Sequence, residues 1–175
     1  ISHCGTQFEV VATPGGRTAR GIQETSAPVA ALETGWGSLR EARPLQKANT
    51  LLSGVRVIDL TRFLSGPFAT LLLSELGADV LKVEPPGGDP TRQFSPIIQG
   101  RSGYFTSVNR GKRTTEIDLK SQAGREWLLD QLPRTDILIE NYRHGVMERL
   151  GLSESVLKAP NPKLVAISIS GYGSG

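Results

Sequence analysis

The sequence predicts an α/β fold with a doubly wound parallel sheet, and two observations carry the prediction. Short runs rich in Val, Ile and Leu alternate with helical stretches from residue 51 to residue 175. Hydrophobic residues make up 38% of the chain and charged residues 21%, which is enough apolar surface for an ordinary core. Alternation of strands with helices is typical of a doubly wound domain, in which helices cover both faces of the sheet.

The first three predicted elements form one strand–helix–strand unit. Residues 55–60 (VRVIDL) are predicted to be a buried strand, and residues 79–84 (DVLKVE) a second one. Gly66-Pro67 predicts the start of a helix, because a proline in the first turn loses no hydrogen bond, and Gly77 predicts its end. Such a unit within about 30 residues implies parallel strands joined by a right-handed crossover.

The later segments continue the alternation after an interruption. Residues 85–103 are predicted to be a long irregular loop, whose length favours a role in binding or gating. Ser121–Leu132 is predicted to be a helix with Ser121 as its N-cap and Trp127 and Leu128 on its apolar face beside Leu132. The other predicted elements are strands at 114–119, 136–140 and 163–170 and short helices at 146–150 and 153–157.

Residues 1–50 differ from the rest of the chain and are assigned to a leader, with residues 51–175 as the main domain. The leader shows no sustained strand or helix period, which indicates a disordered or weakly ordered segment. An organelle transit segment is an alternative, although several Glu residues count against it, and an artefact of gene prediction is another. Because the chain opens on Ile1 and ends at Gly175 in a Gly-Ser run, we expect a fragment.

Composition narrows the class of protein. The net charge of +3, from 20 Lys and Arg against 17 Asp and Glu, is too small to indicate a nucleic-acid partner. The single cysteine, Cys4, excludes an intrachain disulfide and favours the cytoplasm or the mitochondrial matrix over secretion. Cys4 beside His3 lacks further ligands, so no metal site is expected. No apolar run approaches the roughly 20 residues of a membrane helix.

Ligands of parallel sheets bind beyond the carboxyl ends of the strands, so the segments after the predicted strands are the candidate site. The first of them lacks Gly-x-Gly-x-x-Gly, which argues against a nicotinamide or flavin cofactor. The cations of Asn109–Arg113 fit either a phosphate site or a solvated basic turn. Asn141 and Tyr142 fit either hydrogen bonding and stacking on a nucleotide or local packing. His144 is interpreted as a surface loop residue.

Many short motifs occur in one order along residues 51–175, and together they point to one family. They include Asp59-Leu-Thr-Arg62, Gly66-Pro67, Lys82-Val-Glu84, Asn109-Arg-Gly-Lys-Arg113, Asp118-Leu-Lys120, Asn141-Tyr142, Arg149-Leu-Gly151 and Ser170-Gly-Tyr-Gly173. This pattern resembles the N-terminal region of the class III CoA-transferases (CaiB/BaiF type), which include formyl-CoA and carnitine CoA-transferases. Within the family, the succinyl-CoA:glutarate type is the subgroup that the sequence resembles.

The resemblance implies a Rossmann-like domain with an incomplete sheet, a smaller second domain and an interlocked homodimer in the full-length protein. It implies coenzyme A or acyl-CoA as substrate, with a carboxylic acid, and no permanently bound cofactor or membrane partner. Pro85 departs from members that carry an Arg after the second strand, which puts one CoA contact in doubt. Carried over by position, the CoA contacts are Leu64, Ser65, Ile117, Asp118, Leu119, Lys120, Asn141, Tyr142, Arg143, Arg149, Ser170, Gly171, Tyr172 and Gly173.

The chemistry that the resemblance implies is acyl exchange through an aspartyl nucleophile. That Asp attacks the thioester and forms a mixed anhydride and then an enzyme–CoA thioester, which divides one difficult step into easier ones. Its position lies beyond Gly175, so no catalytic residue is assigned here, and we expect this fragment to be inactive and poorly soluble. Asp59 and Asp136 bound predicted strands and are interpreted as structural. The alternative function is a 2-methylacyl-CoA racemase or epimerase of the same superfamily.

Overall fold

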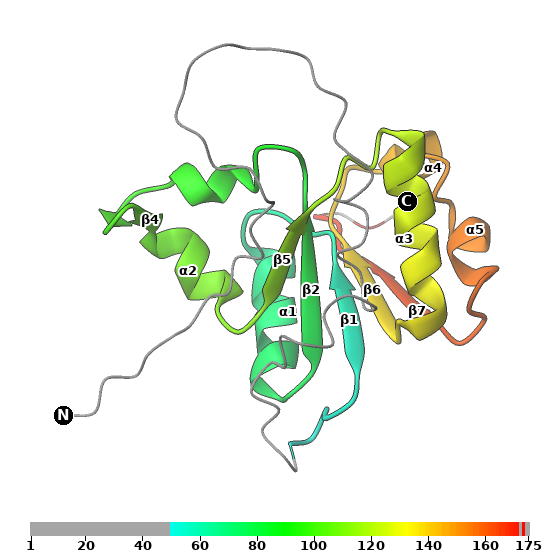
Figure 1. Cartoon of the computed structure of the whole chain (residues 1–175), viewed down its shortest axis with the longest axis horizontal. Coiled ribbons are helices and arrows are strands. Elements are labelled where there is room, and N and C mark those ends of the chain that lie inside the picture. Colours follow the sequence, from blue (N-terminus) through cyan, green and yellow to red (C-terminus); the bar gives the residue numbers. More distant parts are fainter. Residues whose placement is uncertain (1–49, 172, 174–175) are drawn as a thin grey trace.

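The computed structural model describes residues 50–171 and 173, which form three layers, with helices on both faces of one sheet (Figure 1). The predicted leader, residues 1–50, lies outside the described part except for Thr50. The sheet contains β1 (Arg56–Asp59), β2 (Asp79–Glu84), β5 (Arg113–Glu116), β6 (Ile137–Glu140) and β7 (Val165–Ser168). All neighbouring strands are parallel, in the order β5-β2-β1-β6-β7. The predicted Rossmann-like parallel sheet is confirmed, because the chain moves outward from β1, returns beside it and continues in the opposite direction.

The two faces of the sheet are covered by different helices. Helix α1 (Ser65–Glu75) lies on one face, where an apolar cluster of Val57, Val80 and Ile139 packs with Leu73. Helices α3 (Gln122–Gln131), α4 (Val146–Arg149) and α5 (Glu154–Lys158) cover the other face. There a larger cluster joins the strands to these helices through Ile58, Leu81, Leu138, Trp127, Leu128, Met147 and Leu157. Alternate residues of β1, β2 and β6 thus enter opposite cores, as pleated strands require.

The helix signals in the sequence are confirmed in detail. Ser121 accepts a hydrogen bond from the Gly124 amide at 2.9 Å and so caps α3. Gly77 has φ of +101°, the left-handed conformation expected directly after the end of α1. Trp127, Leu128 and Leu132 are buried on the predicted apolar side, although Leu132 belongs to a 3₁₀ turn, η4 (Leu132–Arg134), that ends the helix.

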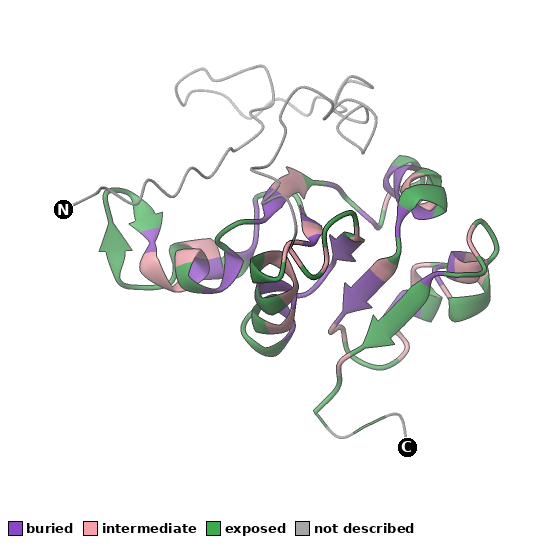
Figure 2. Cartoon of the chain, turned by 90° about the horizontal axis from the view of Figure 1, so that it is seen from below, coloured by how far each residue is buried: buried purple, intermediate pink, exposed green. Residues whose placement is uncertain are grey.

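The prediction of an irregular loop over residues 85–103 is wrong. This segment contains the 3₁₀ turn η3 (Pro90–Gln93) and a hairpin of β3 (Ile97–Ile98) and β4 (Arg101–Ser102), and α2 (Gly103–Asn109) begins at its end. The hairpin projects from the sheet beside α2 (Figure 2). These elements are too short for a periodic pattern, and side-chain caps define them instead. Asp89 accepts from the Thr91 amide, and Ser102 accepts from the Phe105 amide.

A network of buried charges lies between the sheet and the start of α1. Lys112 donates to Asp59 at 3.0 Å, and Lys82 forms an ion pair with Asp89 at 3.1 Å. The four side chains are at most 1% exposed, and we call them the buried ion network. Thr61 and Thr70 also donate to the Asp59 carboxylate. Because burial of unpaired charge costs several kcal/mol, these residues hold one another in place.

The network shifts the pKa values of its members. Burial favours a higher pKa for Asp59, but Lys82, Lys112 and the threonine hydroxyls outweigh it and hold the pKa below the usual 3.8. Burial also favours a higher pKa for Asp89, but the positive charge of Lys82 and the hydrogen bonds from Thr91 outweigh it and hold the pKa below the usual 3.8. Burial lowers the pKa of Lys112 to about 8, against the attraction of Asp59. The interpretation of Asp59 as a structural residue is therefore supported.

None of the helices among the described residues is long and apolar enough to cross a membrane. Several apolar side chains remain exposed on α1 and β7, including Phe68, Leu72, Val165 and Ile167. β7 is the edge of the sheet, and all of its residues are exposed. Apolar edges of this kind need cover from further protein, which agrees with a sheet that is incomplete within these residues.

The buried carboxylates predict a loss of stability in acid. A carboxyl whose folded pKa is depressed stabilises the fold above its unfolded pKa and stops doing so as the pH falls through the folded value. We therefore expect the melting temperature to fall steeply as the pH drops below about 4. Asp89→Asn should lower the melting temperature at neutral pH and weaken its fall in acid. Asp130→Asn, on the exposed side of α3, should leave the dependence of the melting temperature on pH unchanged. Circular dichroism melts across pH test this, and an unchanged fall in acid in Asp89→Asn contradicts it.

Candidate functional site

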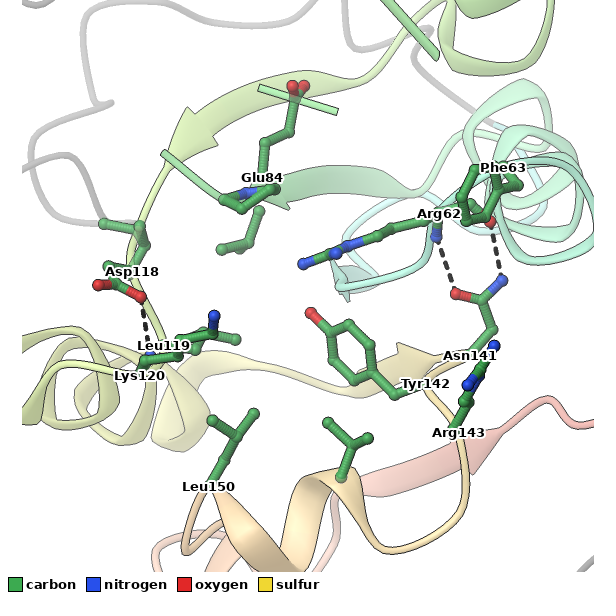
Figure 3. A pocket seen from close by; sticks show the side chains of 14 residues that line it. Arg62, Phe63, Glu84, Asp118, Leu119, Lys120, Asn141, Tyr142, Arg143 and Leu150 are labelled. Atoms are coloured by element: carbon green, nitrogen blue, oxygen red, sulfur yellow. Dashed lines mark hydrogen bonds between the residues drawn. The ribbon is translucent and has the colours of Figure 1, made fainter. Parts of the chain in front are cut away.

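A pocket of about 390 Å³ opens at the carboxyl ends of four strands, β1, β2, β5 and β6 (Figure 3). It lies beside the point where the chain order reverses between β1 and β6, which is where open parallel sheets bind ligands. The turn after β1, the ends of β2, β5 and β6, and helix α4 each contribute to the wall. The lining residues are Arg62, Phe63, Val83, Glu84, Pro85, Ile117, Asp118, Leu119, Lys120, Asn141, Tyr142, Arg143, Val146 and Leu150.

Arg62 and Tyr142 face each other across the centre of the pocket. The Arg62 guanidinium lies 5.2 Å from the centroid of the Tyr142 ring, a cation–π arrangement (Figure 3). Burial raises the pKa of the Tyr142 hydroxyl, and the positive charge of Arg62 opposes this rise. The phenol therefore stays protonated at neutral pH, and its ring presents a flat, partly buried surface to the pocket.

Asn141 joins the turn after β1 to the end of β6. Its side-chain oxygen accepts from the Arg62 amide, and its side-chain nitrogen donates to the Arg62 carbonyl, both at 2.8 Å. This pair of bonds links residues 79 positions apart in the sequence. Both amide atoms of Asn141 thus hold the backbone of Arg62, which sets the position of the Arg62 side chain over Tyr142.

The pocket combines an apolar wall with a positively charged rim. Val83, Ile117, Leu119, Val146 and Leu150 supply aliphatic surface, since all five line the cavity. The cations at the rim are Arg62, Lys120 and Arg143, the last two exposed. An aliphatic wall, an aromatic ring and several cations are the features that a purine with attached phosphates requires.

The two acidic residues of the pocket are engaged with their own neighbours. The Glu84 carboxylate points away from Tyr142 and accepts two bonds from Arg92, at 2.6 and 2.7 Å (Figure 3). Arg92 also stacks on the Phe105 ring, with its guanidinium 3.9 Å from the ring centroid. Asp118 accepts from the Lys120 amide at 3.0 Å, which orders the start of the loop before α3. The rim as a whole therefore remains cationic.

Seven of the residues predicted from the sequence meet in this pocket: Ile117, Asp118, Leu119, Lys120, Asn141, Tyr142 and Arg143. Others do not line it. Leu64 and Ser65 are exposed on the turn before α1, Arg149 is exposed on α4, and Ser170, Gly171 and Gly173 are exposed beyond β7. Tyr172 lies outside the described residues. That these residues contact CoA stays a prediction.

The contacts predicted from the sequence leave out seven further lining residues: Arg62, Phe63, Val83, Glu84, Pro85, Val146 and Leu150. Arg62 and Phe63 belong to the segment after the first predicted strand, and that position alone was a usable signal. Val146 in α4 and Leu150 directly after it are ordinary aliphatic side chains, and nothing in the sequence separates them from core positions.

The basic cluster at Asn109–Arg113 is structural. Arg110 pairs with Glu75 at 3.0 Å, Lys112 belongs to the buried ion network, and Arg113 binds Asp79 through bonds of 2.7 to 3.0 Å. Each cation is therefore engaged within the fold rather than directed at a phosphate. His144 is exposed, as expected of a surface loop residue. Across residues 50–171 and 173, no group of three or more His, Cys, Asp or Glu is arranged to hold a metal ion.

A family model for CoA-transferase family III matches residues 52–175. The chain belongs to this family. Curated proteins named as CoA-transferases are similar to this chain, which spans about a third of their length. An acetyl-CoA:oxalate CoA-transferase of Acetobacter aceti is 46% identical over 121 residues, which are 69% of this chain and 31% of that protein. The alpha subunit of a succinyl-CoA–L-malate CoA-transferase of Chloroflexus aurantiacus is 40% identical over 91% of this chain and 36% of its own.

Solved structures agree with the family III assignment. A CAIB/BAIF family protein from Brucella suis superposes with a TM-score of 0.69 and 41% identity, over 73% of this chain and 35% of that chain. A hypothetical protein from Mycobacterium tuberculosis superposes with a TM-score of 0.68 and 37% identity, over 73% of this chain and 35% of its own. The Rossmann-like part of the fold is thus shared with known structures at substantial sequence identity.

Gly124 offers a test of how the pocket wall is built. A Cβ atom at this position would lie 2.0 Å from the carbonyl oxygen of Asp118, so only glycine lets α3 pack against the loop that lines the pocket. We expect Gly124→Ala to lower the free energy of unfolding by about 1–3 kcal/mol, as overpacking does, despite the better helix propensity of alanine.

Ala123→Gly is the matched control, because residue 123 is exposed on the same helical turn. It should cost about 1 kcal/mol through helix propensity alone. Urea denaturation measures both variants. A Gly124→Ala protein as stable as the wild type contradicts the steric argument.

Proposed function

We propose that the protein is a CoA-transferase that moves CoA from an acyl-CoA donor to a carboxylic acid, and that these residues supply its CoA-binding site. The observation that carries the proposal is the pocket at the strand ends, where Arg62 lies over the Tyr142 ring and Lys120 and Arg143 line the cavity together with an aliphatic wall. Adenine suits the ring and the wall, and the phosphates of the nucleotide suit the cations.

The proposed contacts fall into two groups. Ile117, Asp118, Leu119, Lys120, Asn141, Tyr142 and Arg143 are proposed to contact the nucleotide end of CoA, because they line the pocket. Leu64, Ser65, Arg149, Ser170, Gly171, Tyr172 and Gly173 are proposed to contact the rest of CoA outside it. Asn141 acts mainly by holding Arg62, since both of its amide atoms already bond that backbone.

The proposed reaction follows the family chemistry. An aspartyl nucleophile, at a position beyond Gly175, attacks the thioester carbonyl and forms a mixed anhydride, and the CoA thiolate leaves. The CoA thiolate then attacks the aspartyl carbonyl of the anhydride, which releases the donor carboxylate and leaves an enzyme–CoA thioester. The acceptor carboxylate attacks this thioester and displaces CoA to form a second anhydride. CoA finally attacks the acceptor acyl carbonyl of that anhydride, which gives the product acyl-CoA and frees the aspartate. The exchange needs no ATP, because each step conserves the energy of an activated acyl group.

Small dicarboxylic acids are the proposed acceptors. Similar curated proteins are named for oxalate, mesaconate and L-malate, which are dicarboxylic acids. Glutarate with succinyl-CoA as donor remains the subgroup prediction. The interlocked homodimer and a location in the mitochondrial matrix or cytoplasm are part of the same proposal, as is the absence of a permanent cofactor.

Tyr142 provides the test of the CoA site. In the full-length protein, Tyr142→Ala should weaken CoA binding about tenfold, because loss of one stacked aromatic ring costs about 1–3 kcal/mol. Tyr104→Ala is the control, since the Tyr104 ring packs at a tilt against Phe94, with the ring centroids 5.5 Å apart, and does not line the pocket. Isothermal titration with CoA gives the affinities, and equal weakening by both variants contradicts the proposed site.

The reaction is tested with succinyl-CoA and a panel of dicarboxylic acids, without ATP. Formation of a new acyl-CoA is the expected result. Normal CoA binding with no exchange for any acceptor contradicts the transferase proposal. Deuterium exchange at the α-carbon of a 2-methylacyl-CoA, without CoA transfer, would instead indicate the racemase alternative, which no named relative supports.

A further inference from the structure

Residues 61–67 comprise the turn after β1 and the first three residues of α1, and side chains from other elements hold this segment, called the turn below, at three points. Lys82 donates to the Thr61 carbonyl at 2.7 Å, Asn141 holds both backbone groups of Arg62, and Lys112 donates to the Pro67 carbonyl at 2.8 Å. The two lysines are fully buried members of the ion network. Each therefore bonds one end of the turn from inside the fold, while Asn141 bonds it from the pocket side.

The turn needs this external support because its own residues do not favour its conformation. Phe63 has φ of +67°, a left-handed conformation that a bulky residue adopts only when its surroundings enforce it. Leu64 precedes α1 without a side-chain cap, so the first helical turn lacks the usual local restraint. Gly66 packs so closely on Thr61 that a Cβ atom would lie 2.3 Å from the Thr61 Cβ.

The same turn presents groups to the pocket. Arg62 and Phe63 line it, and Arg62 lies over the Tyr142 ring. A displacement of Thr61 would move Arg62 relative to Tyr142, because Thr61 and Arg62 are adjacent in the chain. A displacement of Pro67 would reach Arg62 through the four residues between them. A misplacement of about 1 Å in a binding group is enough to reduce affinity or rate by a large factor.

We propose that Lys82 and Lys112 are positioning residues that fix residues 61–67 and thereby the CoA-facing groups of this turn. This inference rests on the proposed function, since CoA is the ligand that the turn would serve. Neither lysine lines the pocket, so both act through the turn and not by contact with the ligand. Asp59 and Asp89 make the arrangement possible, because they balance the two buried charges.

The test uses charge-balanced double variants of the full-length protein. Lys82→Met/Asp89→Asn and Lys112→Met/Asp59→Asn each remove one bond to the turn without leaving a buried carboxylate unpaired. Each introduced asparagine keeps a side-chain oxygen that can accept the bonds from Thr61 or Thr91. These variants are expected to fold, because replacing a whole buried ion pair is tolerated far better than removing one partner.

Arg113→Met/Asp79→Asn is the matched control. This pair is also largely buried, but it joins the beginnings of β2 and β5, at the opposite end of the sheet from the pocket. Its hydrogen bonds of 2.7 to 3.0 Å join Arg113 to Asp79 and not to residues 61–67. A general loss of stability would therefore affect all three double variants alike, whereas a loss of positioning would affect only the two lysine variants.

Two measurements decide the outcome. The CoA affinity, measured by isothermal titration, should fall about tenfold or more in both lysine variants, because each loses one charge-assisted hydrogen bond that fixes the turn. In the control variant the affinity should stay within about twofold of the wild type. Hydrogen exchange should show lower protection of the Arg62 amide in the lysine variants only. Unchanged affinity and unchanged protection in the lysine variants overturn the inference.

The failure of this inference is distinguishable from failure of the proposed function. If wild-type protein binds CoA and the lysine variants bind it equally well, the CoA site stands and the positioning role is wrong. If wild-type protein binds no CoA, the proposed function fails, and the inference falls with it. If the control loses as much affinity as the lysine variants, the lysines support stability alone.

Discussion

Two lysine ammonium groups buried under the start of α1 constrain the rest of this structure. Lys82 lies within β2 and points to the α1 face of the sheet, where Asp59 also lies. Neither the Lys82 ammonium nor the Asp59 carboxylate can be buried in this apolar layer without a partner of opposite charge. Asp89 from the loop after β2 and Lys112 from the segment before β5 supply those partners, so both segments are tied to the sheet.

Hydrogen bonds connect the buried ion network to the pocket. Lys82 and Lys112 bond the two ends of the turn after β1, and Asn141 from β6 bonds its middle. The turn in turn places Arg62 over Tyr142. Glu84, at the end of β2, binds Arg92 and the Asp89 amide, which orders η3 near the same edge. The ligand edge is thus built on paired charges, while the two apolar cores hold the helices.

The candidate site was predictable where it consists of contiguous residues. Residues 117–120 and 141–143 follow predicted strands directly, and parallel strands bring such segments to one edge. Arg62 belongs to the same kind of segment, and its position directly after the first predicted strand was a usable signal. Val146 and Leu150 were not predictable, since their place in the wall depends on how α4 returns over the strand ends.

The sequence by itself determined the alternation of strands and helices, the parallel sheet and the family, because these depend on local periodicity and on motifs in order. The N-cap at Ser121 and the helix end at Gly77 are local in the same way. Only the tertiary structure decided that the basic cluster at Asn109–Arg113 is structural, because Glu75, Asp79 and Asp59 lie at least 34 positions away. It also decided the short elements of residues 90–102, which are too short for a repeating pattern and are ordered by side-chain caps and by the ion pairs of Asp89 and Arg92 with β2.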